Sequence, residues 1–505
     1  MANPLFDTLF ARHAGSKAPF LHLADGSTLS YDAFLRRTAR LAHALHDAGL
    51  APGDRLAAQV PKSAGALAVY AACVQAGIVF LPLNSAYTPA EVGYFVTDSG
   101  AGLLLCDPVR ADSLRPVAEG AGAALMTLDA DGGGSLTGAA RSLPETFGTV
   151  PREADDLAAL LYTSGTTGRS KGAMLTQDNL LSNARVLAGY WRFTDRDVLL
   201  HALPIFHTHG LFVATNTVLM TGGAMIWQPR FDIDAVIAAL PEATAMMGVP
   251  TFYTRLLDDP RLTRDLVAHM RLFTSGSAPL LAETHEAFAA RTGHRILERY
   301  GMTETNMTTS NPYDGERRAG TVGFALPGVE VRITDPETGA EVPQGEVGML
   351  EVRGPNVFRG YWNMPEKTAE EMRGDGFFIT GDLGVIDARG YVTIVGRIKD
   401  VVISGGYNIY PKEIEMFLDD RPGVLESAVV GVPHPDLGEV PVAILVPEPG
   451  TAPDTEVISA AAEAALARFK RPRRLILVDA LPRNTMGKVQ KNALRAEYAG
   501  LFEAR

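Results

Sequence analysis

The densest set of residues able to carry out chemistry lies between Leu161 and Gly172, in the sequence LYTSGTTGRSKG. Its three glycines allow the backbone to approach a ligand closely, and its five Ser and Thr hydroxyls and two cations can contact negatively charged oxygens. Lys171 supplies one of these positive charges. The segment therefore predicts a loop between a strand and a helix that binds a polyphosphate. It does not end in GKS or GKT, so it is not a Walker A loop.

Further motifs rich in Gly, His, Tyr and charged residues follow along the chain. They are PIFHTHG at 204–210, SGSAPL at 275–280, RYGMTET at 299–305, GDLG at 381–384, GRIKD at 396–400, GGYNIYPKEIE at 405–415 and PRNTMGKVQK at 482–491. With these motifs in this order, nearly the whole chain resembles the adenylate-forming superfamily of acyl-CoA synthetases, luciferases and peptide-synthetase adenylation domains. The resemblance implies that a carboxylate is joined to AMP from Mg-ATP, that pyrophosphate is released, and that the acyl group then passes to a thiol.

The resemblance also implies how Mg-ATP is held. The glycine-rich loop would contact the β and γ phosphates, Tyr300 would stack against adenine, and Thr303 would contact an α-phosphate oxygen. Glu304 would bind Mg²⁺, while Asp382 would accept from the ribose hydroxyls with Arg397 as a second contact. The full set implied to bind ATP or AMP is Thr163, Ser164, Gly165, Thr166, Thr167, Gly168, Lys171, Ser277, Tyr300, Gly301, Met302, Thr303, Asp382 and Arg397.

Lys488 matches the catalytic lysine of adenylation in this superfamily, where it acts with Thr303 and Glu304. When a carboxylate attacks the α-phosphate, negative charge builds around phosphorus, so a fixed cation matters more than a base. Lysines at this position are acetylated in some relatives, so a protein lysine acetyltransferase acting on Lys488 is a further expected partner. Lys399 occupies the position where the superfamily hinges its small carboxy-terminal domain, which rotates between the two half-reactions.

Contacts to CoA are implied by the same resemblance. Gly405, Gly406 and Tyr407 resemble the loop that lines the pantetheine tunnel, where missing side chains let a slim thiol arm through. Arg471 lies in a short basic segment that could meet the CoA phosphates. A solvated basic face is the alternative interpretation of that segment.

The acid pocket of the superfamily is walled by the segments that contain His207, Ser277 and Arg299. The Asp that amino-acid-activating relatives carry near Phe206 is absent. A guanidinium at the end of a pocket favours a second carboxylate, held through two parallel hydrogen bonds. Here the chain resembles malonyl-CoA synthetases, which activate malonate and often methylmalonate. In the alternative interpretation, Arg299 pairs with a neighbouring acid such as Glu298 and only shapes the site.

Alternating helices and short apolar strands must position these residues, which predicts an α/β fold of layered subdomains. The expected strands end in Gly, Ser, Thr or Pro clusters, where α/β proteins place ligands. A small β-rich subdomain is expected over 320–395, and a mobile α+β domain over 399–505 follows an N-terminal domain over 1–398. The other expected elements are helices over 31–49, 410–420 and 454–469, and strands over 54–60, 77–83, 157–162, 224–227, 271–274, 295–298, 425–432 and 440–446.

The composition of the 505 residues, with 46% hydrophobic and 21% charged residues, is that of an ordinary globular protein. A net charge of -12 without a basic run argues against nucleic-acid binding. Two distant cysteines exclude a disulfide framework or a thiolate zinc site and favour a reducing cytoplasm. The apolar stretch 66–83 is interrupted by Gln75, Gly77 and Pro82, so a buried helix followed by a strand is expected there rather than a membrane span, and no secretory signal is expected at the N-terminus.

Three alternative functions remain open at this level. One is a CoA ligase for a short, medium-chain or aromatic monocarboxylate. Another is a stand-alone adenylation module that loads a carrier protein, which is disfavoured because no carrier domain is seen in the sequence. A protein that binds ATP without chemistry is disfavoured by the presence of Lys488, Glu304 and Asp382.

Overall fold

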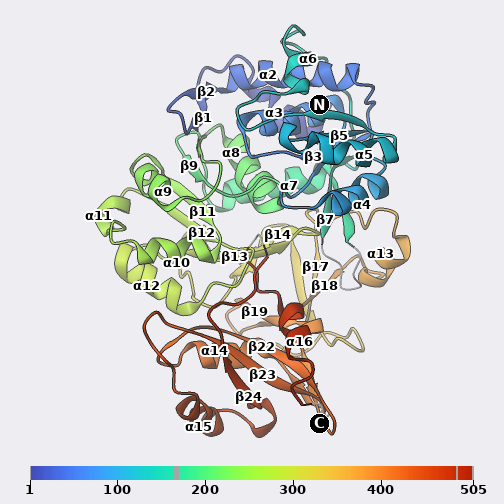
Figure 1. The fold of residues 1–505 in the computed structure, drawn as a ribbon. Coiled ribbons are helices and arrows are strands. Elements are labelled where there is room, and N and C mark those ends of the chain that lie inside the picture. The colour runs from blue at the N-terminus through green and yellow to red at the C-terminus, as the bar shows by residue number, and fades with distance from the viewer. Residues whose placement is uncertain (1, 164–169, 406, 485–486, 503–505) are drawn as a thin grey trace. The chain divides into compact units, whose positions relative to one another are not determined.

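The computed structural model describes residues 2–163, 170–405, 407–484 and 487–502. These residues form two compact units (Figure 1). The larger unit comprises Met1–Glu330 and Val352–Phe378, and the smaller unit comprises Val331–Glu351 and Ile379–Arg505. The predicted boundary between residues 398 and 399 is the point about which the C-terminal part is expected to rotate. That boundary stays a prediction.

One sheet of the larger unit has six strands in the order β6-β5-β3-β4-β7-β8. All neighbours pair in parallel except β7 and β8, which are antiparallel with Thr163 opposite Lys171. The glycine-rich loop therefore joins two strands, and the prediction of a strand-to-helix connection was wrong. The run from Lys171 is mostly buried and pairs along β7, and the next helix begins only after the N-cap Thr176. The strands are β3 (Arg55–Gln59), β4 (Val79–Pro82), β5 (Leu103–Cys106), β6 (Ala124–Thr127), β7 (Leu157–Thr163) and β8 (Lys171–Thr176).

The second sheet of the larger unit has nine strands in the order β15-β14-β13-β12-β11-β9-β10-β1-β2. Its central strands β10, β9, β11, β12 and β13 are parallel, so their carboxyl ends lie at one edge, as predicted for a ligand-binding α/β sheet. The strands are β1 (Pro19–Leu23), β2 (Thr28–Ser30), β9 (Val198–His201), β10 (Ala224–Trp227), β11 (Ala245–Gly248), β12 (Leu272–Ser275), β13 (Leu297–Met302), β14 (Asn306–Ser310) and β15 (Phe324–Ala325).

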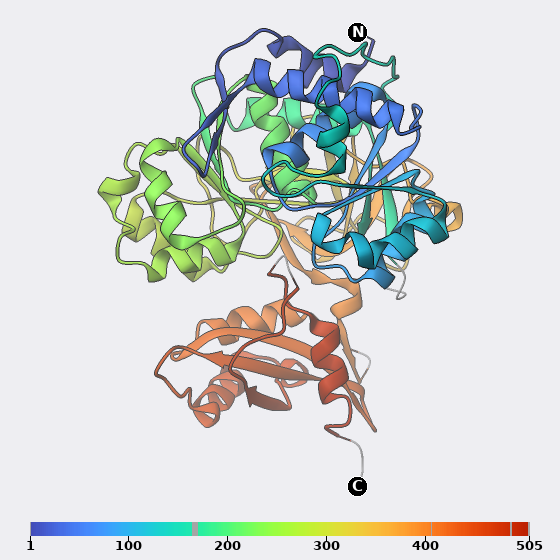
Figure 2. The ribbon, with the colours of Figure 1, turned by 45° about the horizontal axis from the view of Figure 1, so that its top comes forward.

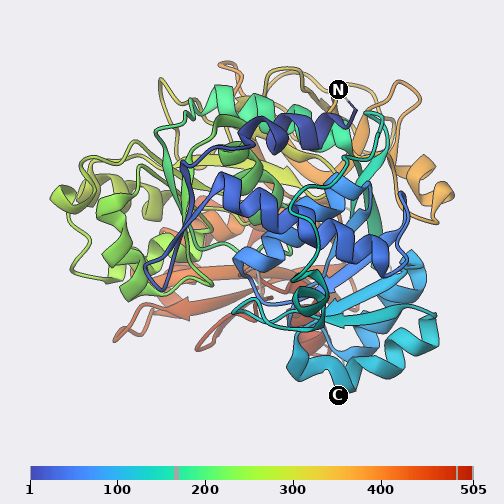
Figure 3. The ribbon, with the colours of Figure 1, turned by 90° about the horizontal axis from the view of Figure 1, so that it is seen from above.

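Helix α3 confirms the prediction for the apolar stretch. All of its residues are buried, and Gly77 ends it in the left-handed conformation two residues before β4 begins. The longer helix α2 lies against α3 (Figure 3). Among the described residues, none of the helices combines the length and apolarity needed to cross a bilayer. The α-helices of this unit are α1 (Pro4–Leu9), α2 (Tyr31–Asp47), α3 (Ala64–Ala76), α4 (Pro89–Ser99), α5 (Ala111–Ala121), α6 (Ser135–Ala140), α7 (Gln177–Tyr190), α8 (Asn216–Thr221), α9 (Ile233–Ala239), α10 (Pro250–Asp258), α11 (Arg264–Val267), α12 (Ala282–Thr292) and α13 (Pro365–Glu371).

The smaller unit holds a four-stranded sheet in the order β16-β17-β18-β19, which matches the predicted β-rich region and crosses into the larger unit only at strand ends. It also holds a five-stranded sheet in the order β21-β20-β23-β22, with β24 beside β23. The strands are β16 (Glu330–Thr334), β17 (Gly348–Arg353), β18 (Phe378–Ile386), β19 (Val392–Arg397), β20 (Val402–Ser404), β21 (Tyr407–Ile409), β22 (Val424–His434), β23 (Gly438–Pro447) and β24 (Arg474–Leu477).

Strand β22 is apolar on both faces because both are covered. Val429 points into a cluster with α14 (Pro411–Asp419) and α15 (Thr455–Ala465), whereas Val430 points into a cluster with α16 (Lys491–Tyr498). Figure 2 shows α16 against these strands. The predicted helix over 454–469 was too long, because a short 3₁₀ turn replaces its last residues ahead of Pro472.

Candidate active site

Arg299 projects from β13 into the interior of the larger unit, with 2% of its surface exposed. Among the described residues, no hydrogen-bond partner reaches its Nε and Nη2 atoms. The side chain of Glu298 accepts from the Leu280 amide at 3.1 Å, and its negative charge also acts on the guanidinium of Arg299. The guanidinium packs directly over Gly276, where any Cβ atom would overlap it. This buried cation is therefore available to an external anion.

Two imidazoles and a hydroxyl lie beside this guanidinium. The His209 amide donates to His207 Nδ1 at 3.3 Å, and His209 Nδ1 lies 3.1 Å from Ser277 Oγ. His207 Nδ1 is an acceptor, so the neutral ring carries its proton on Nε2. Ser277 has a φ of +70°, a strained conformation for a residue with a side chain. The structure thus brings together all three residues predicted for the acid pocket.

The charges of this pocket are asymmetric. Burial, and then the positive charge of Arg299, lower the pKa of His207 to about 4. The same causes, in the same order, lower the pKa of His209 well below its usual value. Burial lowers the pKa of Arg299 to about 9, which still leaves it charged at pH 7. One cation therefore faces two neutral imidazoles and a hydroxyl.

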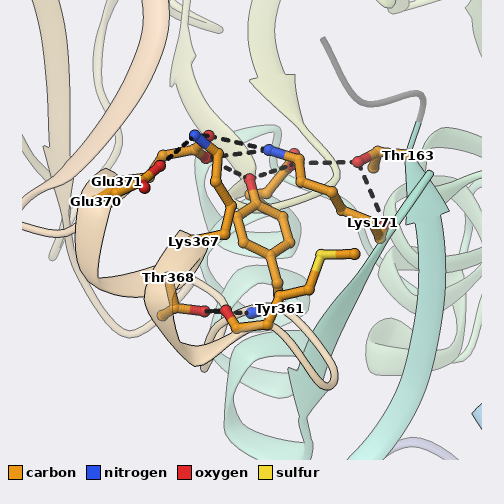
Figure 4. Close-up of polar contacts among 9 residues, drawn as sticks. Thr163, Lys171, Tyr361, Lys367, Thr368, Glu370 and Glu371 are labelled. Atoms are coloured by element: carbon orange, nitrogen blue, oxygen red, sulfur yellow. Dashed lines mark hydrogen bonds and ion pairs between the residues drawn. The ribbon is translucent and has the colours of Figure 1, made fainter. Parts of the chain in front are cut away.

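Glu304 lies at the edge of the glycine-rich loop, in a network of hydroxyls and charges. Its Oε1 accepts from Thr163 Oγ1 at 3.3 Å and from the Tyr361 hydroxyl at 3.1 Å. The single proton of Tyr361 is shared with Glu371, whose oxygen lies 2.6 Å away. Lys171 Nζ donates to Glu371 at 3.0 Å and lies 4.0 Å from the centroid of the Tyr361 ring (Figure 4).

This network fits a Mg²⁺ ion that arrives with ATP. Such an ion needs one or two carboxylates, with substrate phosphates and water as its other ligands. Glu304 supplies a carboxylate 4% exposed, next to the hydroxyl of Thr163. In the ranges that the structure describes, no cluster of three or more His, Cys, Asp or Glu residues could hold a metal by itself. Burial, and then Glu304, raise the pKa of Tyr361, which therefore stays a protonated donor.

Tyr300, Gly301 and Met302, which are predicted to bind the nucleotide, form the end of β13. Tyr300 is half-buried, and its hydroxyl lies 3.9 Å from Met302 Sδ. Gly301 has no room for a side chain, because a Cβ atom would overlap the Asn306 carbonyl. Thr303 is half-buried in the turn that follows. The predicted phosphate ligands Ser164, Gly165, Thr166, Thr167 and Gly168 lie outside the described residues.

The smaller unit gathers the predicted ribose and catalytic residues. Arg397 Nε pairs with Asp382 Oδ1 at 2.7 Å, and Asp382 is almost fully buried. Lys399 is exposed in the 3₁₀ turn Ile398–Asp400 that joins β19 to β20. Partial desolvation, and then the cation Arg397, lower the pKa of Lys488 to about 8, although much of its surface is exposed.

Hydrogen bonds and an ion pair hold the described residues on either side of Lys488. Asn484 Oδ1 accepts from the Lys488 amide at 2.9 Å, and Arg483 Nη1 donates to the Gly487 carbonyl at 2.6 Å. Lys491 pairs with the buried Glu415 on α14 at 2.5 Å. These contacts fix the backbone and leave the Lys488 side chain accessible.

The predicted CoA residues are only partly described. Gly405 has a φ of +56°, and its amide donates to the Leu437 carbonyl at 2.9 Å. Tyr407 pairs with Ser404 through the backbone, whereas Gly406 lies outside the described residues. The guanidinium of Arg471 donates to the carbonyls of Leu466 and Glu463 near the end of α15, so its role toward CoA stays a prediction.

Sequence reasoning missed three residues of these sites. His209 lies two positions from His207, and its spacing gave no sign that both rings face Arg299. Tyr361 and Glu371 follow Glu304 by 57 and 67 positions and carry no motif of their own. Only the fold of the segment around α13 brings them to Glu304 and Lys171.

Comparison with known proteins now places this geometry in a family. The model of the AMP-binding enzyme family matches residues 9–362, and that of the AMP-binding enzyme C-terminal domain matches residues 413–488. The chain belongs to the AMP-binding enzymes. This membership confirms the adenylate-forming resemblance and the α/β fold class inferred from the motifs.

Relatives of this AMP-binding enzyme act on different acids. A feruloyl-CoA synthase of Amycolatopsis is 38% identical over 94% of both chains, and a malonate–CoA ligase of Arabidopsis thaliana is 35% identical over 83% of this chain and 74% of the relative. The ATP-bound structure of MatB from Rhodopseudomonas palustris is 57% identical, covers 100% of both chains and superimposes with a TM-score of 0.98.

The packing of Arg299 over Gly276 gives a first prediction. In Gly276→Ala, the new methyl group displaces the guanidinium, so KM for the acid substrate should rise about tenfold or more, the scale expected when a contact residue is shifted. ATP–pyrophosphate exchange measures it. Gly189→Ala is the matched control, because no atom lies within 4 Å of a Cβ at that helix position. An unchanged KM in Gly276→Ala would show that the guanidinium is not fixed by this glycine.

Proposed function

We propose that this AMP-binding enzyme is a malonate–CoA ligase. Malonate and Mg-ATP give malonyl-AMP and pyrophosphate, and CoA then gives malonyl-CoA and AMP. The observation that carries the proposal is the buried guanidinium of Arg299, whose Nε and Nη2 atoms have no hydrogen-bond partner among the described residues. Methylmalonate, which has the same two carboxylates, is a second acid that the pocket would accept.

The energetics favour a diacid. A buried ion without its partner is destabilised by about 3 to 5 kcal/mol relative to the paired state. The far carboxylate of malonate supplies that partner and can accept from two guanidinium nitrogens in parallel. The Nε2–H of His207 and the hydroxyl of Ser277 are further donors beside it. A monoacid would leave Arg299 uncompensated, and so would be rejected by about two to three decades in kcat/KM.

The relatives support malonate as the substrate only in combination with the residues of the proposed acid pocket. The malonate–CoA ligase of Arabidopsis thaliana is 35% identical, but the feruloyl-CoA synthase of Amycolatopsis is 38% identical. Overall identity therefore does not separate a diacid from an aromatic monoacid. An aromatic monoacid would favour an apolar pocket end, and a charged guanidinium at the proposed acid site disfavours it.

In the proposed adenylation step, the protein stabilises negative charge. The carboxylate is already a nucleophile, so the protein supplies positive charge and donors around the α-phosphate. Lys488 bridges the attacking carboxylate and the α-phosphate, and Thr303 donates to a phosphate oxygen. Glu304 and the Thr163 hydroxyl would hold Mg²⁺, which neutralises phosphate charge when bound. When ATP binds, Lys171 leaves Glu371 and pairs with the β and γ phosphates.

The thioester step uses a second arrangement of the same chain. The boundary between residues 398 and 399 separates the parts that rotate, with the exposed Lys399 as the hinge. Rotation removes Lys488 from the reacting centre and brings in the loop Gly405–Tyr407, which lines the path of the pantetheine thiol. Arg471 contacts CoA phosphates through the guanidinium N–H groups that do not bond α15.

A protein lysine acetyltransferase is a proposed regulator, because acetylation would remove the charge of Lys488, whose side chain is exposed. Incubation with such an enzyme and an acetyl donor, followed by mass spectrometry of the Lys488 peptide, tests this role. We place the reaction in the cytoplasm, where ATP and CoA are present and where the free Cys73 and Cys106 stay reduced.

Removal of the guanidinium tests the choice of acid. In Arg299→Ala, kcat/KM for malonate should fall by about 100-fold or more, because the far carboxylate loses its buried partner. Turnover of propionate, which has no such carboxylate, should change by less than about threefold. ATP–pyrophosphate exchange with each acid measures both effects.

Arg295→Ala is the matched control, because Arg295 lies four residues earlier, is half exposed and pairs with Glu286. It should leave both acids unaffected. Equal losses for malonate and propionate in Arg299→Ala would mean that the side chain only shapes the site. Faster turnover of an aromatic acid than of malonate by the natural enzyme would overturn the proposed function.

The lowered pKa of Lys488 predicts a pH dependence of adenylation. The charged form is the active one and is present below a pKa of about 8, so kcat/KM for ATP should fall as the pH rises through that value. Pyrophosphate release measured from pH 6 to 10 checks this. Lys488→Ala should be slower by about 100-fold and lose that limb of the profile. A natural enzyme whose rate stays constant up to pH 10 would contradict the role of Lys488.

A further inference from the structure

A lysine outside the acid pocket lies beside an imidazole rather than a carboxylate. Lys62 Nζ donates to His201 Nδ1 at 2.9 Å and to the His201 carbonyl at 2.8 Å. It also lies 4.2 Å from the centroid of the Trp227 ring. In the part of the chain that the structure describes, no carboxylate pairs with Lys62, and burial lowers its pKa well below the usual value. The neighbours of this amine are therefore an imidazole nitrogen, a backbone carbonyl and an aromatic ring.

The contacts of His201 define which of its nitrogens carries the proton. A backbone carbonyl only accepts, so the neutral ring is protonated on Nε2, which faces Gly210, and its Nδ1 accepts from Lys62. His201 Nε2 lies 2.9 Å from the Gly210 carbonyl and donates to it. Thr215 Oγ1 donates to the same oxygen at 2.9 Å. Lys62 thereby orients an imidazole whose other nitrogen holds a backbone carbonyl.

That carbonyl belongs to the turn that carries the acid-pocket imidazoles. Gly210 is the second residue of a π-helix that runs from His209 to Thr215, a rare geometry that is frequent at functional sites. A Cβ atom at Gly210 would overlap the Pro204 carbonyl, so the chain folds back tightly here. The Leu211 amide donates to the His207 carbonyl at 3.1 Å, which links the turn to the first of the two imidazoles.

We propose that Lys62 is a positioning residue of the acid pocket. Its hydrogen bonds to His201 fix the orientation of the ring that holds the Gly210 carbonyl, and this contact keeps His207 and His209 beside Arg299. The identity of the acid rests on the proposed function, whereas the link from Lys62 to the π-helix rests on the geometry alone.

Lys62→Met removes the donor and keeps the length of the side chain. KM for malonate should rise about tenfold, the scale of losing the outer partner of a ligand-binding His, while kcat and KM for ATP should stay within about twofold. His201→Leu should give the same rise, and the double variant should be no worse than either single variant, because both break one chain of contacts. Lys17→Met is the control, since Lys17 is exposed and pairs with Asp32 at the surface.

Hydrogen–deuterium exchange without substrate separates this proposal from the proposed function. Lys62→Met should speed amide exchange over residues 203–215 and leave the smaller unit unchanged. Lys62→Gln, whose shorter amide reaches less far, should show a smaller rise in KM of about threefold with the same local change. Unchanged KM and exchange in Lys62→Met, or in Lys62→Gln if Lys62→Met does not fold, would overturn the proposal. Failure of the natural enzyme to turn over malonate would overturn only the proposed function.

Discussion

The guanidinium of Arg299 is buried in the larger unit with no hydrogen-bond partner for its Nε and Nη2 atoms among the described residues, and the proposed acid pocket is arranged around that constraint. Gly276 has no side chain, which leaves room for the guanidinium. Ser277, the next residue, has a strained backbone with a positive φ. Burial keeps the two neighbouring imidazoles neutral, so they add donors without adding repulsion. In the proposed function, a small anion from outside completes the charge balance of this site.

The proposed function separates selection of the acid from its activation. The residues proposed to select the acid lie on β13, on the turn after β12 and on a π-helix, next to parallel strands that end at one edge of a mixed sheet. Sites built on such elements hold their geometry precisely. Lys488, the lysine proposed to act in adenylation, instead lies in the smaller unit, where the charges of Arg397 and Asp382 influence its pKa. A rigid site suits discrimination between acids, and a lysine on a separate unit suits two half-reactions that need different groups.

Much of this could be predicted from the sequence where local signals were strong. The strand over 224–227 was predicted to the residue, and Gly77 marked the change from α3 to β4. The prediction that a helix follows the glycine-rich loop was wrong. A run of six residues is too short for its pattern to distinguish a paired strand from the start of a helix.

The motifs named Arg299, His207 and Ser277, but not the contacts that support them. The hydrogen bond between Lys62 and His201 joins residues 139 positions apart, and that between Tyr361 and Glu304 joins residues 57 positions apart. Such pairings depend on tertiary packing and leave no pattern in spacing or composition. The π-helix at His209 likewise has no sequence signature that separates it from an α-helix.

Malonamate tests the central claim most directly, because it keeps the reacting carboxylate and the size of malonate but replaces the far carboxylate with a neutral amide. ATP–pyrophosphate exchange by the natural enzyme at pH 7 should give a kcat/KM for malonate that exceeds that for malonamate by about 100-fold or more, the scale of leaving a buried cation unpaired. Equal values for the two acids would contradict the account, because the far charge would then contribute nothing to recognition.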